Sequence, residues 1–382
     1  MNPIEIVTPR RLVLGAGSIA RWPEMAIQEG WKRIAVLSVA PVWPMLEPSL
    51  QDAGAKGLVV LKLDYTLAGE PTTDYFQQLR GQTAALQPDA ILGVGGGSVL
   101  DIAKLLAALS DKTAPVTAFF GKGLVPGRKL GLICAPTTAG TGSEVSPNAI
   151  LLDSADSEKK GIISPFLLPD CTLIDPALTA SLPPRITAET GMDALCHCLE
   201  AYINKFAHPL VDTAALRGIE LVGKNLLRAC RDGQDLQARE ALATASMLGG
   251  LCLGPVNTCG VHALSYGLAG KYHLSHGLAN ALLLAEVMRF NRPACEDRYA
   301  AIARVLDLPV NGDVVHDADL TIDFVSSLSA ACGIPRHLSE IGIRAEDIPE
   351  MAGMAMNVTR LLRNNPREIR REDVMEIYQN IY

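Results

Sequence analysis

The sequence contains no run of 18 or more uncharged apolar residues, although 48% of its 382 residues are hydrophobic. A helix that crosses a bilayer needs about 20 such residues in succession, so no membrane span is predicted. The N-terminal stretch MNPIEIVTPRR also lacks the basic and then apolar pattern of a secretory signal. These absences predict a cytoplasmic protein with no membrane partner.

Cysteine pairs and basic patches are absent as well. None of the nine cysteines forms a C-x-x-C pair, which argues against a disulfide framework and against a thiolate zinc site. Acidic residues outnumber basic ones by 41 to 34, the net charge is −7, and no dense Lys/Arg stripe occurs. Nucleic acid is therefore not expected as a partner. Cys196 and Cys198 flank His197, but helix neighbours at ±1 point away from one another, so both are interpreted as packing residues.

The length indicates two domains, because 382 residues exceed one typical hydrophobic core. In the first half, short apolar runs alternate with helical patterns, which is typical of a parallel sheet covered on both faces. The predicted strands are residues 33–40, 57–64, 89–95, 129–137 and 171–176. Later in the chain, apolar residues recur at three- and four-residue spacing, as in helices. We therefore predict an α/β domain with a Rossmann-like parallel sheet over residues 1–182, and an all-helical domain over residues 183–382.

Two glycine-rich segments compete as a phosphate-binding turn. GAGSIA at 15–20 fits G-x-G-x-x-A, but no acidic residue follows at the expected distance, so a tight turn is the simpler interpretation. GVGGGSVLDIAK at 93–104 follows a buried strand and opens a helix, where glycines let backbone N–H groups approach a pyrophosphate. The candidate residues of this second segment are Gly95, Gly96, Gly97, Ser98 and Asp101.

A loop rich in hydroxyl groups and glycine follows the strand at 129–137. In open α/β sheets, ligands bind at the carboxyl ends of the strands, so this loop is predicted to hold ribose or phosphate oxygens. An ordinary loop with a Ser/Thr helix cap is the alternative. The candidate residues, all within PTTAGTGSEVS, are Thr137, Thr138, Thr141 and Ser143.

The stretch GMDALCHCLEAY at 191–202 places Asp193 and His197 four residues apart in an apolar, helical context. Side chains at that spacing share one helix face, and a buried carboxylate is costly unless a positive charge neutralises it. The segment 260–281 adds His262, His273 and His276. A carboxylate with several imidazoles suits Fe(II) or Zn(II) better than Mg²⁺ or Ca²⁺. The pattern predicts a divalent transition-metal site, with iron and zinc both open.

These motifs occur in a fixed order with LIDPALTASLPP at 173–184, HALSYGLAGKYHLSHGLANALLL at 262–284 and NNPRE at 364–368. Together they resemble the iron-dependent alcohol dehydrogenase family over most of the chain. The resemblance implies an N-terminal α/β domain that binds NAD or NADP, and an all-α C-terminal domain that holds a catalytic divalent metal. It also implies that metal and nicotinamide meet in the cleft between the domains, and that the protein is a dimer or larger homo-oligomer.

The resemblance assigns roles to individual residues. It implies Fe(II) first and Zn(II) second as the metal. The family's metal ligands correspond to Asp193, His197, His262 and His276, its pyrophosphate loop to Gly95, Gly96, Gly97 and Ser98, its second cofactor loop to Thr137, Thr138 and Thr141, and its cofactor-contacting lysine to Lys160.

Three positions depart from the family pattern. Many members carry a histidine on the proton path where this chain has Tyr266, and a phenol with an ordinary pKa of about 10 carries protons less well near neutral pH. Tyr266 and His273 are therefore both candidates for proton transfer. NAD-preferring members often end the second strand with an aspartate that repels a 2′-phosphate, whereas Val39 here admits NADPH as well. Ser275 replaces the usual proline before His276.

The expected reaction is reversible hydride transfer between a small alcohol and its carbonyl form, with the metal as a Lewis acid. One alternative is a reductase of an anionic substrate, such as maleylacetate or a phosphonate- or sulfonate-bearing aldehyde. Another is a lyase resembling dehydroquinate synthase, which returns its NAD⁺ unchanged. A binding protein with a relict site is a third, and the intact set of metal-ligand positions argues against it.

Overall fold

The computed structural model describes residues 3–156, 158–272 and 274–382. This part of the chain divides into two compact units. The α/β unit comprises Ile6–Thr138 and Gly142–Ala180, and the helical unit comprises Ala139–Thr141, Ser181–Tyr382 and the N-terminal residues up to Glu5. The boundary proposed from the sequence, between residues 182 and 183, stays a prediction.

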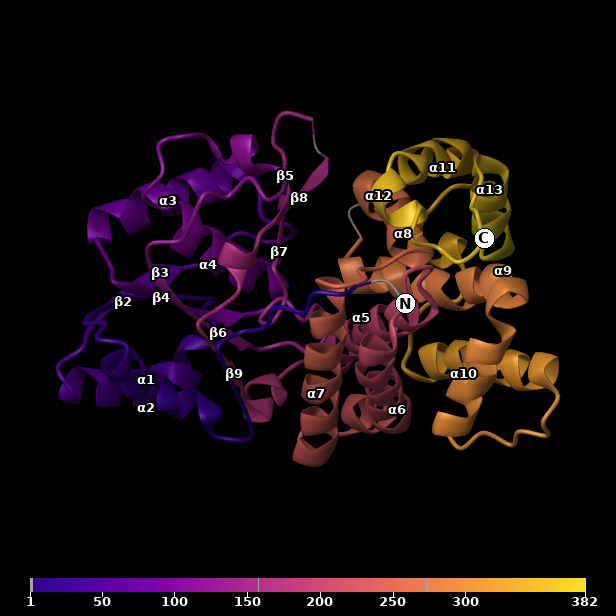
Figure 1. The fold of residues 1–382 in the computed structure, drawn as a ribbon, viewed down its shortest axis with the longest axis horizontal. Coiled ribbons are helices and arrows are strands. Elements are labelled where there is room, and N and C mark those ends of the chain that lie inside the picture. The colour runs from indigo at the N-terminus through magenta and orange to yellow at the C-terminus, as the bar shows by residue number, and fades with distance from the viewer. Residues whose placement is uncertain (1–2, 157, 273) are drawn as a thin grey trace. The chain divides into compact units, whose positions relative to one another are not determined.

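A six-stranded parallel sheet forms the centre of the α/β unit (Figure 1). Every pair of neighbouring strands in it is parallel. Two central strands are buried along their whole length, as their continuous apolar sequences require. In spatial order the strands are β1 (Arg11–Leu14), β9 (Cys171–Ile174), β6 (Gly131–Pro136), β4 (Ala90–Gly95), β2 (Arg33–Ser38) and β3 (Val59–Asp64). The parallel α/β fold predicted from the sequence is confirmed.

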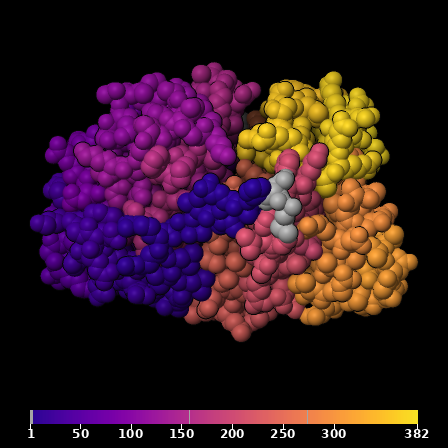
Figure 2. Space-filling view, in the orientation of Figure 1, coloured from indigo at the N-terminus to yellow at the C-terminus, as the bar shows by residue number. Residues whose placement is uncertain are grey.

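Helices cover both faces of this sheet. They are α1 (Trp22–Gln28), α2 (Trp43–Ala55), α3 (Thr73–Leu86) and α4 (Gly97–Leu109). Alternate residues of a strand point to opposite faces: Ile34 and Val36 of β2 pack with α1 and α2, whereas Ala35 and Leu37 pack with α3 and α4. Figure 2 shows α1 and α2 in the indigo region of this unit's surface and α3 in the purple region.

Two features of this unit are absent from the sequence-based prediction. One is the edge strand β1, whose residues are exposed or half-buried. The other is a small sheet in the order β5 (Gly121–Lys122), β8 (Lys159–Ile163) and β7 (Asn148–Leu152). These strands are short and partly exposed, and β5 and β8 mix lysine with glycine, so they carry no clear apolar alternation.

The helical unit is built around α5, whose residues are nearly all buried after its first turn. Helices α6, α7 and α9 pack directly on it. Its main helices are α5 (Pro184–Ile203), α6 (Pro209–Arg231), α7 (Leu236–Leu253), α8 (Gly260–Tyr272), α9 (His276–Val305), α10 (Val314–Ala331), α11 (Ile348–Met356), α12 (Thr359–Leu362) and α13 (Arg371–Asn380). Helix α9 kinks at Cys295, two residues after Pro293. Within the described ranges, no helix combines the length and the apolar character needed to cross a membrane.

Candidate functional site

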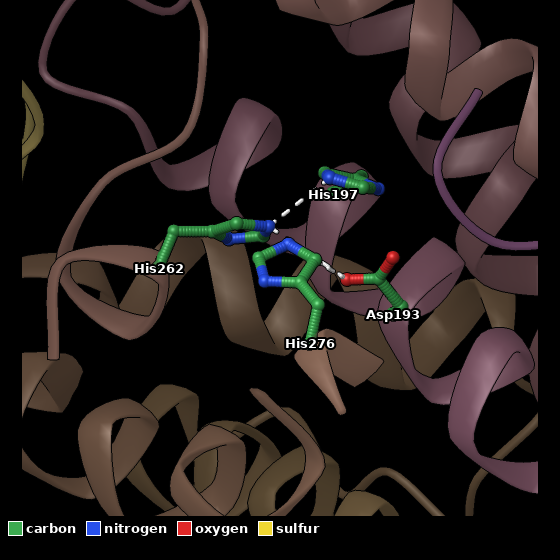
Figure 3. A group of neighbouring side chains, drawn as sticks. All are labelled: Asp193, His197, His262 and His276. Carbon is green, nitrogen blue, oxygen red and sulfur yellow. Dashed lines mark hydrogen bonds and ion pairs between the residues drawn. The ribbon is translucent and has the colours of Figure 1, made fainter. Parts of the chain in front are cut away.

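The four predicted metal ligands lie together inside the helical unit (Figure 3). Asp193 and His197 are one turn apart on α5, His262 lies in the first turn of α8, and His276 is the first residue of α9. Each offers a ligand atom, and these atoms all lie within 4.8 Å of one another. The first three residues are buried and His276 is half-buried.

The start of α9 can approach α5 closely because Gly277 has no side chain. A Cβ at Gly277 would meet the backbone oxygen of Glu189 at 2.4 Å. Ser275 caps α9 by accepting a hydrogen bond from the Leu278 N–H, and its own hydroxyl donates to the Glu189 carboxylate. The serine that replaces the usual proline therefore secures the helix start that carries His276.

Hydrogen bonds on the far side of two imidazoles determine which nitrogen faces the site. The Nδ1–H of His262 donates to Glu200 Oε2 over 2.6 Å, and the Nδ1–H of His197 donates to the Gly140 carbonyl over 3.2 Å. Each Nε2 therefore carries a lone pair. These two Nε2 atoms are 3.0 Å apart, and Asp193 Oδ1 is 3.7 Å from His262 Nε2 and 3.8 Å from His276 Nε2.

Such a group of acceptor atoms fits a shared cation. Two lone pairs 3.0 Å apart repel one another unless a positive charge lies between them. The separations of 3.0–3.8 Å also match the edges of a tetrahedron, which are about 3.4 Å long for metal–ligand bonds of about 2.1 Å.

The charges of these side chains also suit a metal. Burial by itself raises the pKa of Asp193, but the neighbouring imidazoles of His197, His276 and His262, when protonated, outweigh it and lower the pKa below its ordinary value. Burial likewise lowers the pKa of His197, which keeps that ring neutral. A carboxylate with neutral imidazole is the protonation state that metal binding needs.

Glu200, on α5, is a functional candidate that the sequence analysis misses. Its carboxylate is buried and accepts three hydrogen bonds, from the His262 ring and from the backbone N–H groups of Cys259 and Val261. Histidine ligands in metal sites commonly donate to such a carboxylate. Cys196 lies 3.7 Å from the His262 ring, but burial raises its pKa well above the ordinary value, so it stays a thiol.

Asn280 is a second candidate that the sequence analysis misses. Its amide lies one turn after His276 on α9, is fully buried, and donates to Asp193 Oδ1 over 2.8 Å. The same nitrogen is 3.2 Å from both His262 Nε2 and His276 Nε2. The spacing of four residues from His276 was an available signal, although a helical asparagine is most often a surface residue.

In the α/β unit, the two predicted cofactor loops lie side by side. Gly95 ends β4, and α4 begins at Gly97. The Thr137 N–H donates to the Gly95 carbonyl over 2.9 Å, and a Cβ at Gly96 would lie 3.5 Å from the Thr138 side chain. A Cβ at Gly95 would meet Val99 at 2.6 Å, so only glycine fits there. The turn thus presents the open N-terminus of a helix, which is a suitable anion site.

A hydrogen bond between the Ser143 hydroxyl and the Asp101 carboxylate connects the two loops. Asp101 accepts from the Ser143 hydroxyl and from the Ile150 N–H, at 2.9 Å for the latter. The fully buried Lys104 ammonium donates to the Ser143 carbonyl and hydroxyl at 2.9 and 2.8 Å. Contact of Asp101 and Ser143 with a cofactor stays a prediction. Lys104 is a further member of this buried hydrogen-bond network, and the sequence analysis does not single it out.

The remaining predicted residues are placed as follows. Thr141 falls in the short segment that packs with the helical unit. Lys160, on β8, forms ion pairs with Asp153 and Asp156. Val39, just after β2, is half-buried and lines a cavity. Their contact with a cofactor stays a prediction.

The two candidates for proton transfer also stay predictions. Tyr266, on α8, is half-buried and packs against the helical core. His273 lies outside the described residues.

Glu144, next to this network, is expected to make the free energy of unfolding depend on pH. Its side chain is buried, its Oε1 has no hydrogen-bond partner among the residues that the structure describes, and burial raises its pKa from 4.5 to about 7. Between those two values the folded state binds more protons than the unfolded state, so this group's contribution falls as pH rises. We expect the wild type to lose about 3 kcal/mol relative to E144Q between pH 4.5 and 7.

Urea unfolding of both proteins at pH 5, 6, 7 and 8 measures this difference. The informative quantity is the difference in free energy of unfolding between wild type and E144Q at each pH, because all other groups titrate in both proteins. Curves that stay parallel over that range would contradict the raised pKa of Glu144.

Comparison with known proteins agrees with this architecture. The profile described as iron-containing alcohol dehydrogenase matches residues 9–176, and the profile of the C-terminal part of the Fe-containing alcohol dehydrogenase family matches residues 187–382. The chain is 32% identical over 380 residues to sulfoacetaldehyde reductase from Bilophila wadsworthia (strain 3_1_6), with 97% of each chain covered. It is 37% identical over 295 residues to 1,3-propanediol dehydrogenase from Citrobacter freundii, covering 77% of this chain and 76% of the other.

Solved structures extend the agreement to the fold. A crystal structure of 1,3-propanediol oxidoreductase superposes with a TM-score of 0.95 at 31% identity, and both chains are covered completely. The structure of sulfoacetaldehyde reductase from Bifidobacterium kashiwanohense, in complex with NAD⁺, gives a TM-score of 0.90 at 27% identity and covers 100% of this chain and 99% of the other. The resemblance inferred from the sequence is confirmed. The chain belongs to the iron-containing alcohol dehydrogenase family, and it is an oxidoreductase of that family.

Proposed function

We propose that the protein is a metal-dependent, NAD(P)-linked alcohol dehydrogenase or aldehyde reductase that acts on a small substrate. The observation that carries this proposal is the 3.0 Å approach of the His197 and His262 Nε2 lone pairs beside the buried Asp193 carboxylate. Together with His276, these side chains would hold one divalent ion, with Fe(II) favoured by the family and Zn(II) second. Such an ion would polarise a carbonyl oxygen or lower the pKa of an alcohol.

The protein's own groups have defined tasks in this reaction. Glu200 and the Gly140 carbonyl hold the two imidazoles with Nε2 directed inward. Asp193 supplies one negative charge, so a divalent ion in the site would keep a net positive charge, and Asn280 holds that carboxylate in place. In the α/β unit, the turn from Gly95 to Ser98 offers backbone N–H groups to a pyrophosphate.

A direct test combines metal and cofactor. Metal-free protein would be reconstituted anaerobically with Fe(II) or Zn(II), and NADH and NADPH oxidation followed at 340 nm with a panel of aldehydes. We expect turnover to require metal and to consume reduced cofactor in proportion to aldehyde. Release of product without net consumption of NAD(P)H would indicate a lyase instead.

The cytoplasmic location and the homo-oligomer expected from the sequence stay predictions.

A reductase of an anionic aldehyde is the second candidate. It is favoured by the relative from Bilophila wadsworthia, which is named a sulfoacetaldehyde reductase and is matched over 97% of both chains. The aldehyde panel should therefore pair neutral compounds with sulfonate- and phosphonate-bearing ones. A kcat/KM at least tenfold higher for an anionic aldehyde would identify this class.

Tyr266 is the described candidate for the proton path. We expect Tyr266→Phe to lower kcat by on the order of 100-fold, because general acid–base groups contribute about 10²–10⁴-fold, while metal content stays unchanged. Tyr382→Phe, at an exposed C-terminal tyrosine, is the matched control. A kcat within about threefold of the wild type would remove Tyr266 from the proton path and leave His273 as the candidate.

A further inference from the structure

A cavity of about 570 Å³ opens at the carboxyl ends of β2 and β3 in the α/β unit. It is lined by residues 39–41, which follow β2, and by residues 64–68, which end and follow β3. Among these lining residues, Asp64 carries the single charge, and neither lysine nor arginine is present. A ligand in this cavity therefore meets one carboxylate and no cation from the lining.

Asp64 is held at this edge by the sheet itself. It is the last residue of β3 and pairs in register with Ser38, the last residue of β2. The indole N–H of Trp43 donates to Asp64 Oδ1 over 2.8 Å. The nearby Lys62 lies over the Trp43 ring and within 3.9 Å of Glu47, so its charge has another partner.

The cavity adjoins the turn proposed to bind pyrophosphate. Strand β2 lies next to β4, whose end is the glycine-rich turn, and the Ser38 hydroxyl donates to the Val94 carbonyl over 2.8 Å. Tyr65, which lines the cavity, is 94% buried, and its hydroxyl lies near Ser98 but has no hydrogen-bond partner among the described residues. Because buried hydroxyl groups nearly always form a hydrogen bond, the Tyr65 hydroxyl indicates that a ligand oxygen binds where the turn meets the cavity.

We propose that Asp64 makes the enzyme prefer NAD(H) to NADP(H). This inference rests on the proposed function, in which the turn from Gly95 to Ser98 binds the pyrophosphate and the cavity receives the adenosine. The carboxylate accepts a hydrogen bond from the ribose 2′-hydroxyl of NAD(H), and it repels the 2′-phosphate of NADP(H). Val39, just after the neighbouring strand β2, carries no charge, so β3 supplies the discriminating charge.

Calorimetric titration of metal-reconstituted protein with NADH and NADPH, without substrate, tests this proposal. We expect the wild type to bind NADH at least tenfold more tightly than NADPH. Asp64→Asn can still accept from Trp43, and it should bring the two dissociation constants within about threefold of each other. Glu47→Gln removes a nearby charge outside the cavity lining and should leave the preference unchanged.

The outcomes separate this inference from the proposed function. If the wild type binds NADPH as tightly as NADH, or if Asp64→Asn keeps the full preference, Asp64 is not the discriminating residue. If neither dinucleotide binds, the proposed function itself fails. Circular dichroism of each variant verifies that the fold is intact.

Discussion

Replacement of His276 with alanine is expected to remove bound transition metal and turnover together. His276 supplies one of four ligand atoms that lie within 4.8 Å of one another, so its removal leaves three of them. Losing even a partner of a ligand costs about 10–100-fold in metal affinity, so losing a ligand should cost at least about 100-fold. Turnover should fall by about 10³-fold or more, since Lewis-acid stabilisation is worth several kcal/mol.

Elemental analysis of the purified, anaerobically reconstituted variant measures the metal, and NAD(P)H oxidation measures turnover. His316→Ala is the matched control, because His316 is exposed on α10 and lies outside the cluster. It should keep wild-type metal content and activity. A His276→Ala protein that turns over normally without stoichiometric metal would defeat the assignment of the site.

Replacement of Glu200 with glutamine should weaken metal binding although Glu200 touches no metal. A glutamine amide facing His262 donates to Nδ1, which moves the ring proton to Nε2, the atom that faces the site. We expect the metal affinity to fall by about 10–100-fold. Chelator competition measures the affinity, and ¹⁵N shifts of labelled histidines report the tautomer of His262.

The glutamine variant is preferred to alanine because Glu200 is buried and accepts from two backbone N–H groups as well, and the one oxygen of glutamine still accepts from Val261 while its amide nitrogen faces His262 and Cys259. Each donor left without a partner costs about 1–3 kcal/mol, so Glu200→Ala is expected to unfold more easily. Glu240→Gln, at an exposed position of α7, is the control. A folded Glu200→Gln protein with wild-type affinity and an unchanged His262 tautomer would show that the carboxylate only supports the fold.

The parts of the fold that the sequence predicts share one property, which is a strong local pattern. The strand runs at 33–40, 89–95 and 129–137 are mainly apolar because β2, β4 and β6 are covered on both faces. The edge strand β1 escapes prediction because it is short and partly exposed. The small sheet of β5, β7 and β8 escapes for the same reason.

The residues of the candidate metal site likewise include some that the sequence predicts and some that it does not. Asp193 and His197 are predictable because helix geometry places residues four apart on one face. Three histidines gather in the segment 260–281, and the family resemblance selects His262 and His276 among them. Glu200 and Asn280 are not predictable in this way, because a helical glutamate or asparagine most often faces solvent. Their role follows from contacts with residues 62 and 87 positions away in the chain.

The sequence by itself determined the fold class, the family resemblance and the residue types at the ligand positions. The fold class follows from local periodicity, and the family resemblance and the ligand residue types follow from short motifs in a fixed order along the chain. The tertiary structure alone decided which imidazole nitrogens face inward, that Asp101 points into a buried network, and that Asp64 stands beside Ser38. Each of these depends on which distant segments pack together, because hydrogen-bond geometry and strand register are set by contacts between elements and not by spacing along the chain.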